Sequence, residues 1–302
     1  MNFCPFIDTT LIFTEDCITP CYTNFADKTP YYLKANLKKQ KIPNFSKEKE
    51  SFYKIINSLR INSYSCKNCV HLVTEETKFK KYNHIIISLW QNKAFKYDFF
   101  AIIKDIYKLG MLDIENLIVE IQSGNFAEIS ELNKILAIFK AIGYKEIHFM
   151  MNNVIYHPCI ENILKEGKCS LCIIPNLRNN ELEGREATIK NVLRRYMNAA
   201  KNKNSISVYF ELIRGISDNE VAVSDFVKMM YTCGLNKIAL RLDNNDINKW
   251  LKATIPLQDC PSYFSTLILL FFKLCRRYSF YLDMSYTEQN IVFKKIFKSN
   301  KK

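Results

Sequence analysis

Seven short apolar runs, spread over residues 85–284, constrain the fold of this chain more than any other feature of its sequence. The runs are largely apolar throughout instead of alternating with polar residues, which is typical of strands buried on both faces of a sheet. We expect strands at residues 85–90, 117–121, 146–151, 169–174, 207–213, 237–242 and, from a weaker signal, 279–284.

The segments between these strands carry helical periodicity. One amphipathic stripe contains Phe99, Ile102, Ile103 and Ile106, and a second helical segment ends at Gly143, a residue suited to terminating a helix. Strands and helices that alternate in this way predict βαβ units and a parallel sheet of the α/β class. The pattern alone leaves open a doubly wound sheet and a full or partial (β/α) barrel.

Residues 1–80 differ from the rest of the chain. They hold two close cysteine pairs, a loop at residues 33–45, and one expected helix that Ser46 would cap and that would bury Phe52 and Ile55. We therefore expect a small cysteine-containing domain at residues 1–80, followed by an α/β domain at 81–302 with a helical extension at its C-terminus.

The composition narrows the class of partner and the compartment. The net charge is +13, but the lysines are dispersed and no aromatic-and-basic motif accompanies them, so a nucleic-acid partner is not expected. The N-terminus does not have the pattern of a secretory signal. The longest apolar run, residues 264–272, is shorter than the ~20 residues of a membrane span. These features predict a soluble cytoplasmic protein.

Eleven cysteines in a reducing compartment are expected to be thiols or metal ligands, not a disulfide framework. Cys66 and Cys69 form C-x-x-C, and Cys17 and Cys21 form C-x-x-x-C. With the nearby Cys4 they offer enough soft ligands for zinc or an iron–sulfur cluster. The alternative is that they are buried small hydrophobes and unmetallated thiols. A second C-x-x-C, in the strand expected at 169–174, would point its thiols to opposite faces and is assigned to the core.

The N-terminal segments "CPFIDTTLIFTEDCITPC" and "CKNC" resemble the SPASM-type auxiliary-cluster domain of radical S-adenosylmethionine proteins. The resemblance implies that a 4Fe-4S cluster is held by Cys4, Cys21, Cys66 and Cys69, with Cys17 as an alternate ligand. Zinc is the alternative metal. In most proteins of this type the domain follows the barrel, whereas here it precedes it.

Residues 82–243 are similar to the radical S-adenosylmethionine barrel itself, a partial (β/α)6 barrel. The most specific match is to the G-x-N-D-N-E pattern of the family, at Gly215, Asp218, Asn219 and Glu220.

The sequence departs from this family at the motifs that the radical reaction requires. The family's C-x-x-x-C-x-x-C follows the first strand, which we place at 85–90, and there is no cysteine between Cys69 and Cys159. The G-G-E-P turn is replaced by residues 123–126, T-N-G by residues 151–153, and S-L-D by residues 174–176. The positions that would bind S-adenosylmethionine thus survive only in altered form, at Gly124, Asn125 and Asn152.

The resemblance and its departures predict a protein that keeps an auxiliary metal site and has lost the radical reaction. It would be a pseudoenzyme that acts as a binding or accessory protein for an unidentified protein or peptide partner. The alternatives are a structural zinc protein and a barrel enzyme of unknown reaction, with or without binding of S-adenosylmethionine. Such an enzyme would draw on polar residues at the strand ends: Glu120, Asn125, Asn152, Asn153, Glu211, Arg214, Arg241 and Asp243.

Overall fold

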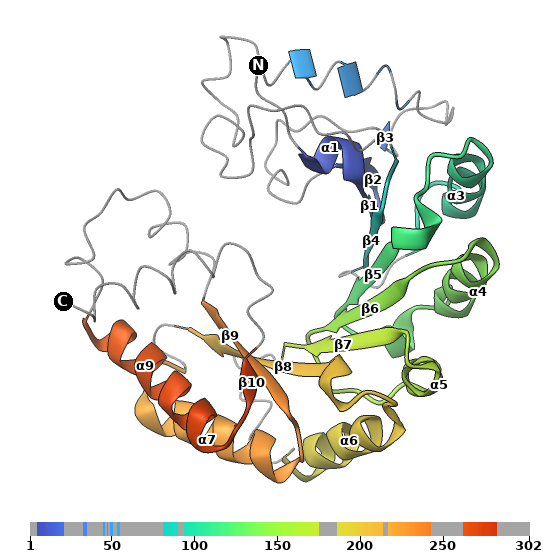
Figure 1. Ribbon diagram of the computed structural model, residues 1–302. Helices are drawn as coiled ribbons and strands as arrows, with labels where there is room; N and C mark the ends of the chain where they lie inside the picture. The colour runs from blue at the N-terminus through green and yellow to red at the C-terminus, as the bar shows by residue number, and fades with distance from the viewer. Residues whose placement is uncertain are drawn as a thin grey trace. The chain divides into compact units, whose positions relative to one another are not determined.

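The computed structural model describes at least part of each of the seven expected strands. The described residues are 5–20, 33–34, 45, 47, 49–50, 53–54, 81–89, 94–174, 186–213, 217–242 and 262–282. They fall into two compact units, residues 1–149 and residues 150–302. Figure 1 shows both units as ribbons.

The first unit is built on a sheet whose strands follow the order β6-β5-β4-β1-β2-β3. The strands are β1 (Thr10–Thr14), β2 (Cys17–Thr19), β3 (Leu33–Lys34), β4 (His84–Leu89), β5 (Ile118–Ser123) and β6 (Glu146–Met151), the last of which crosses into the second unit. β1 runs parallel to β4 with Leu11 opposite Ile85, and β4 runs parallel to β5. On the side of β1 opposite β4, β2 pairs with β1 in antiparallel orientation, and β3 pairs in turn with β2, again antiparallel.

Two helices, α3 (Phe99–Lys108) and α4 (Leu132–Ile142), lie on the same face of this sheet, as Figure 1 shows. The expected stripe of Phe99, Ile102, Ile103 and Ile106 is buried, which confirms the helical reading of that segment. Oδ1 of Asp98 accepts a hydrogen bond from the Ala101 backbone N–H at 2.9 Å and caps α3. A short helix, α1 (Pro5–Thr9), precedes β1, and the 3-10 turns η3 (Ile114–Asn116) and η4 (Phe126–Glu128) flank β5.

The two faces of this sheet differ in chemistry because alternate strand residues point to opposite sides. The face against α3 and α4 is apolar, with Ile85, Ile87, Val119 and Ile121 all buried. The other face carries polar side chains on successive strands: Thr10, Thr14, His84, Ser88, Glu120, Gln122, Glu146 and His148.

The second unit repeats the strand–helix pattern. Its strands are β7 (Cys169–Ile173), β8 (Ile206–Leu212), β9 (Lys237–Leu242) and β10 (Tyr281–Leu282), which pair in parallel in that order. Its helices are α5 (Pro158–Glu166), α6 (Glu186–Ala199), α7 (Glu220–Thr232) and α9 (Ser262–Arg277), with the 3-10 turn η6 (Lys203–Ser205) before β8. The apolar run at 264–272 lies within α9.

Six of the expected strands are confirmed, the seventh is confirmed only at Tyr281–Leu282, and the fold is α/β with a mostly parallel sheet. In neither unit do the described strands close on themselves into a barrel. The expected boundary near residue 80 stays a prediction, because residues 55–80 lie outside the described part of the chain. The helix expected after Ser46 is described only at isolated positions, including Lys49 and Tyr53, so its stripe is likewise untested.

One expectation is corrected: the strand at 85–90 is not the first strand of the parallel sheet. β1 precedes it and pairs with it in parallel over all five of its residues. The sequence pattern missed β1 because its apolar core, Leu11–Phe13, is short and pairs with a segment more than 70 residues away.

Among the described residues, no helix is long and apolar enough to cross a membrane.

Candidate functional site

Only one of the expected metal-ligating cysteines lies within the described residues. Cys17 is the first residue of β2 and is 6% exposed. Cys4, Cys21, Cys66 and Cys69 lie outside the described residues, so their convergence stays a prediction.

The turn that presents Cys17 is organised by the hydroxyl of Thr14, the last residue of β1. Oγ1 of Thr14 accepts from the backbone N–H groups of Asp16, at 3.3 Å, and Cys17, at 3.1 Å. The same oxygen lies 3.2 Å from Sγ of Cys17, where either atom can be the donor. Threonine suits this position because its hydroxyl can replace a backbone partner two or three residues away.

The segment that follows β4 contacts this turn from 80 residues further along the chain. The buried hydroxyl of Tyr97 donates toward two backbone carbonyls, those of Thr14 at 2.7 Å and Cys17 at 3.2 Å. The Lys96 backbone N–H donates to the Glu15 carbonyl at 2.8 Å, and the Lys96 ammonium pairs with Asp16. Burial, together with nearby negative charge, raises the pKa of Tyr97 well above its ordinary value, so the phenol stays a hydrogen-bond donor.

The strand order places this turn at the edge of the sheet formed by the carboxyl ends of its parallel strands. Because β1 is parallel to β4, Cys17 lies just beyond the carboxyl end of a parallel strand. This is the edge at which (β/α) proteins generally bind ligands. The segment after 85–90, in which the sequence suggested a missing cysteine loop, instead holds the turn after β1 through Lys96 and Tyr97.

The altered S-adenosylmethionine positions also follow strand ends. Gly124 and Asn125 follow β5 directly, and the Asn125 side-chain amide donates to Glu128 Oε1 at 2.6 Å. Asn152 follows β6 and belongs to the second unit. Their role in binding a cofactor stays a prediction.

The polar face of the first unit holds titratable groups that the sequence analysis overlooked, apart from Glu120. Nε2 of His84, on β4, lies 3.4 Å from Oε2 of Glu120, on β5, and Glu120 also accepts a hydrogen bond from Gln122. On β6, Nε2 of His148 lies 3.2 Å from Oε2 of Glu146. Within the described part of the chain, both Nε2 atoms are buried and have no aligned hydrogen-bond partner.

These contacts set the charge of Glu120. Burial disfavours its ionised form, but the contacts with His84 and Gln122 and the charge of His148 outweigh burial, so the pKa of Glu120 is lowered. The available signal for this cluster was weak. Glu146 and His148 alternate in the expected strand at 146–151, but Glu120 is the one polar residue in the strand expected at 117–121, and His84 lies just before the strand expected at 85–90.

No metal centre is complete within the described residues. Among them, no three His, Cys, Asp or Glu side chains are placed so that they could hold a metal ion. A centre with three or more such ligands that includes Cys17 must therefore take at least one of them from residues outside the described set.

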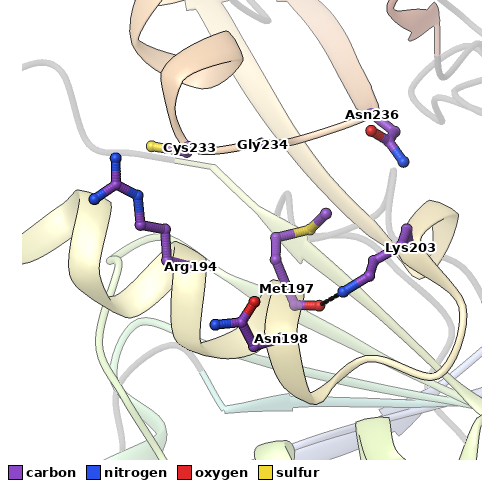
Figure 2. A pocket seen from close by; sticks show the side chains of 7 residues that line it. All are labelled: Arg194, Met197, Asn198, Lys203, Cys233, Gly234 and Asn236. Carbon is purple, nitrogen blue, oxygen red and sulfur yellow. Dashed lines mark hydrogen bonds between the residues drawn. The ribbon is translucent and has the colours of Figure 1, made fainter.

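A pocket of about 380 Å³ in the second unit is lined by two cations, Arg194 and Lys203 (Figure 2). Nη2 of Arg194 donates to the Thr232 carbonyl at 3.2 Å, and the Lys203 ammonium donates to the Met197 carbonyl. Those carbonyls belong to the C-terminal turns of α7 and α6, where positive charge is stabilising. The two cations are thus used to cap helices. The lining residues are Arg194, Met197, Asn198, Lys203, Cys233, Gly234 and Asn236.

The comparisons with known proteins do not assign this chain to a family. No protein-family model matches it, and no curated protein matches it either.

Proposed function

We propose that this protein is a degenerate relative of the radical S-adenosylmethionine proteins, with a partial (β/α) barrel, that binds a metal centre through its N-terminal cysteines. The proposed ligands are Cys4, Cys21, Cys66 and Cys69, with Cys17 as a further candidate. A 4Fe-4S cluster is favoured and zinc is the alternative. The protein would act as a binding or accessory component for a protein or peptide partner, without radical chemistry.

The observation that carries this proposal is the position of Cys17. Its thiol follows the carboxyl end of β1, and β1 is parallel to β4. Cys21 follows four residues later in the sequence. A thiol held at the ligand-binding edge of a parallel sheet is well placed to contribute to a metal centre, and a neighbouring hydroxyl such as that of Thr14 can orient a coordinating sulfur.

The same observation bears on the proposed loss of activity. In the family that the sequence resembles, C-x-x-x-C-x-x-C follows the first strand. After β1 the chain reads Cys17-x-x-x-Cys21-x-x-Asn24, with asparagine at the third position. Asn24 supplies no thiolate, so this segment could not hold a cluster by three cysteines. This reading makes Cys17 a ligand candidate of equal standing with Cys4.

The metal content of anaerobically purified protein tests the proposal. We expect iron and acid-labile sulfide in about equal amounts, or zinc without sulfide if the alternative holds. Cys66→Ala and Cys69→Ala should each lose most of the metal. Cys17→Ala and Cys4→Ala, measured side by side, show which of these two cysteines is the ligand.

Cys159→Ala is the matched control, because Cys159 lies on α5 and belongs to none of the proposed ligand sets. It should retain the metal content of the wild type. A folded wild-type protein that contains neither iron nor zinc after anaerobic preparation would refute the metal centre.

The polar face of the first unit favours a second candidate function, an enzyme of unknown reaction. Imidazole and carboxylate side chains in contact, as in His84 with Glu120 and His148 with Glu146, are the groups that most often transfer protons in catalysis. Saturable binding of S-adenosylmethionine that is weakened by Asn125→Ala would support this candidate. Undetectable binding at millimolar ligand would leave no support for S-adenosylmethionine as its substrate.

A further inference from the structure

Residues 96 and 97 form a clamp on the turn that holds Cys17. The clamp has four contacts: the Tyr97 hydroxyl with the carbonyl of Thr14 and with that of Cys17, the Lys96 backbone with Glu15, and the Lys96 ammonium with Asp16. All of these groups belong to the first unit. The contacts thus connect the loops that follow two neighbouring parallel strands, β1 and β4.

Tyr97 is the central contact because it is buried and fixed by other aromatic rings. Its side chain is 6% exposed, and its ring centroid lies 5.5 Å from that of Phe95. The Phe95 ring in turn stacks on Phe99, the first residue of α3, at 4.5 Å. A hydroxyl held in this way loses little conformational entropy when it forms its hydrogen bonds to the turn. Its removal would deprive the two buried carbonyls, of Thr14 and Cys17, of a hydrogen-bond donor.

The turn transmits this constraint to the thiol. Oγ1 of Thr14 holds the Cys17 backbone N–H at 3.1 Å and lies 3.2 Å from its sulfur, while Tyr97 holds the carbonyls at both ends of the turn. The backbone of Cys17 is therefore held by both Thr14 and Tyr97, and its sulfur is contacted by Thr14.

We propose that Tyr97 is a positioning residue for Cys17: its hydroxyl keeps the turn after β1 closed and thereby sets both the direction and the accessibility of the Cys17 thiol. Insofar as it concerns a metal ligand, the inference rests on the proposed function. The control of thiol accessibility does not depend on a metal.

The test is the alkylation rate of Cys17 in metal-free protein, followed by peptide mass spectrometry. Tyr97→Phe keeps the ring and removes only the hydroxyl. We expect alkylation of Cys17 to become about tenfold faster, which corresponds to about 1.4 kcal/mol in the opening equilibrium of the turn.

Tyr196→Phe is the matched control. The Tyr196 hydroxyl also bonds backbone groups, donating to the Ile155 carbonyl at 2.9 Å and accepting from the His157 N–H at 2.7 Å, but it belongs to the second unit. Its loss should lower the denaturation midpoint without changing the alkylation of Cys17. Thr14→Val provides a second route to the same turn if Tyr97→Phe fails to fold, and it should also expose the thiol.

Equal acceleration in Tyr97→Phe and Tyr196→Phe would overturn the inference, because the effect would then be global destabilisation. Unchanged alkylation in both Tyr97→Phe and Thr14→Val would overturn it as well. A second readout is the release of bound metal to a chelator, which should be faster in Tyr97→Phe than in Tyr196→Phe.

The two readouts keep this inference separate from the proposed function. Faster alkylation with unchanged metal release means that Tyr97 positions Cys17 but that Cys17 is not a ligand. If the wild-type protein never binds metal but Cys17 is still alkylated faster in Tyr97→Phe than in the wild type, the clamp is supported and the proposed metal centre is refuted.

Discussion

Gly143 adopts a backbone conformation that other residues rarely tolerate. Its φ is 97° and its ψ is 148°, at the C-terminal end of α4. A Cβ atom added there would also lie 2.9 Å from Cγ2 of Ile114. The helix end is thus restricted to glycine by both backbone strain and close contact.

We expect Gly143→Ala to lower the free energy of unfolding by about 2–3 kcal/mol. Gly110→Ala is the control, since Gly110 also has a positive φ, of 65°, but an added Cβ would meet no atom within 4 Å. It should cost only about 1 kcal/mol. Urea denaturation measures both values, and equal costs would show that the Ile114 contact is unimportant.

Glu120 gives the protein a predictable response to acid. Because its pKa is lowered in the folded state, its ionised form stabilises the fold fully above the ordinary value of 4.5. That stabilisation is lost as the pH falls from about 4.5 through the lowered pKa of the folded protein.

Glu120→Gln should therefore reduce stability at pH 7 and flatten the loss of stability between about pH 4.5 and lower pH. Thermal denaturation across this range measures the effect. Glu115→Gln, which removes one exposed carboxylate from η3, controls for the change in net charge. An unchanged acid profile in Glu120→Gln would show that the contact with His84 contributes nothing.

At the scale of elements, the C-terminal end of α7 depends on a cation from a neighbouring helix. α7 has no basic residue in its last turn, and the Thr232 carbonyl is instead bonded by Arg194 of α6. The cation is thus supplied by a neighbouring helix, which couples the two elements electrostatically.

Arg194→Gln should destabilise the protein by about 0.3–1 kcal/mol at low ionic strength, and high salt should diminish the difference. Arg276→Gln, at the end of α9, is a matched loss of one positive charge. Denaturation midpoints at two salt concentrations give the comparison. A deficit in Arg194→Gln that persists unchanged in high salt would point to lost packing instead.

At the scale of the whole molecule, β1 makes the N-terminal segment part of the first unit's core. Phe13 is fully buried, pairs with Ile87 in the parallel register, and meets the Phe99 ring edge-on at a centroid distance of 5.1 Å. The described residues from 10 to 19 are therefore packed within the sheet that also contains β4 and β5.

Phe13→Ala should cost about 3–5 kcal/mol of unfolding free energy, the usual price of an aromatic cavity in a core. Tyr107→Ala, at a side chain that is 42% exposed on α3, is the control and should cost less than about 1 kcal/mol. A cost below about 1 kcal/mol for Phe13→Ala would mean that residues 10–19 are an appendage to the sheet.

The sequence by itself determined the strands from β4 to β10, the amphipathic helices α3 and α4, and the α/β class. This was possible because burial on both faces leaves continuous apolar runs, and burial on one helix face leaves a stripe such as Phe99 to Ile106.

Only the tertiary structure decided that β1 is the first parallel strand, that Tyr97 holds the turn at Cys17, and that His84 meets Glu120. Each of these depends on a pairing between distant segments: β1 with β4, residue 97 with residue 14, and β4 with β5. Local sequence patterns indicate which residues of a segment are buried, but they do not indicate which distant segment it pairs with or in which register. Cys17 could therefore be recognised from the sequence as a candidate ligand, while its place at the carboxyl end of β1 required the fold.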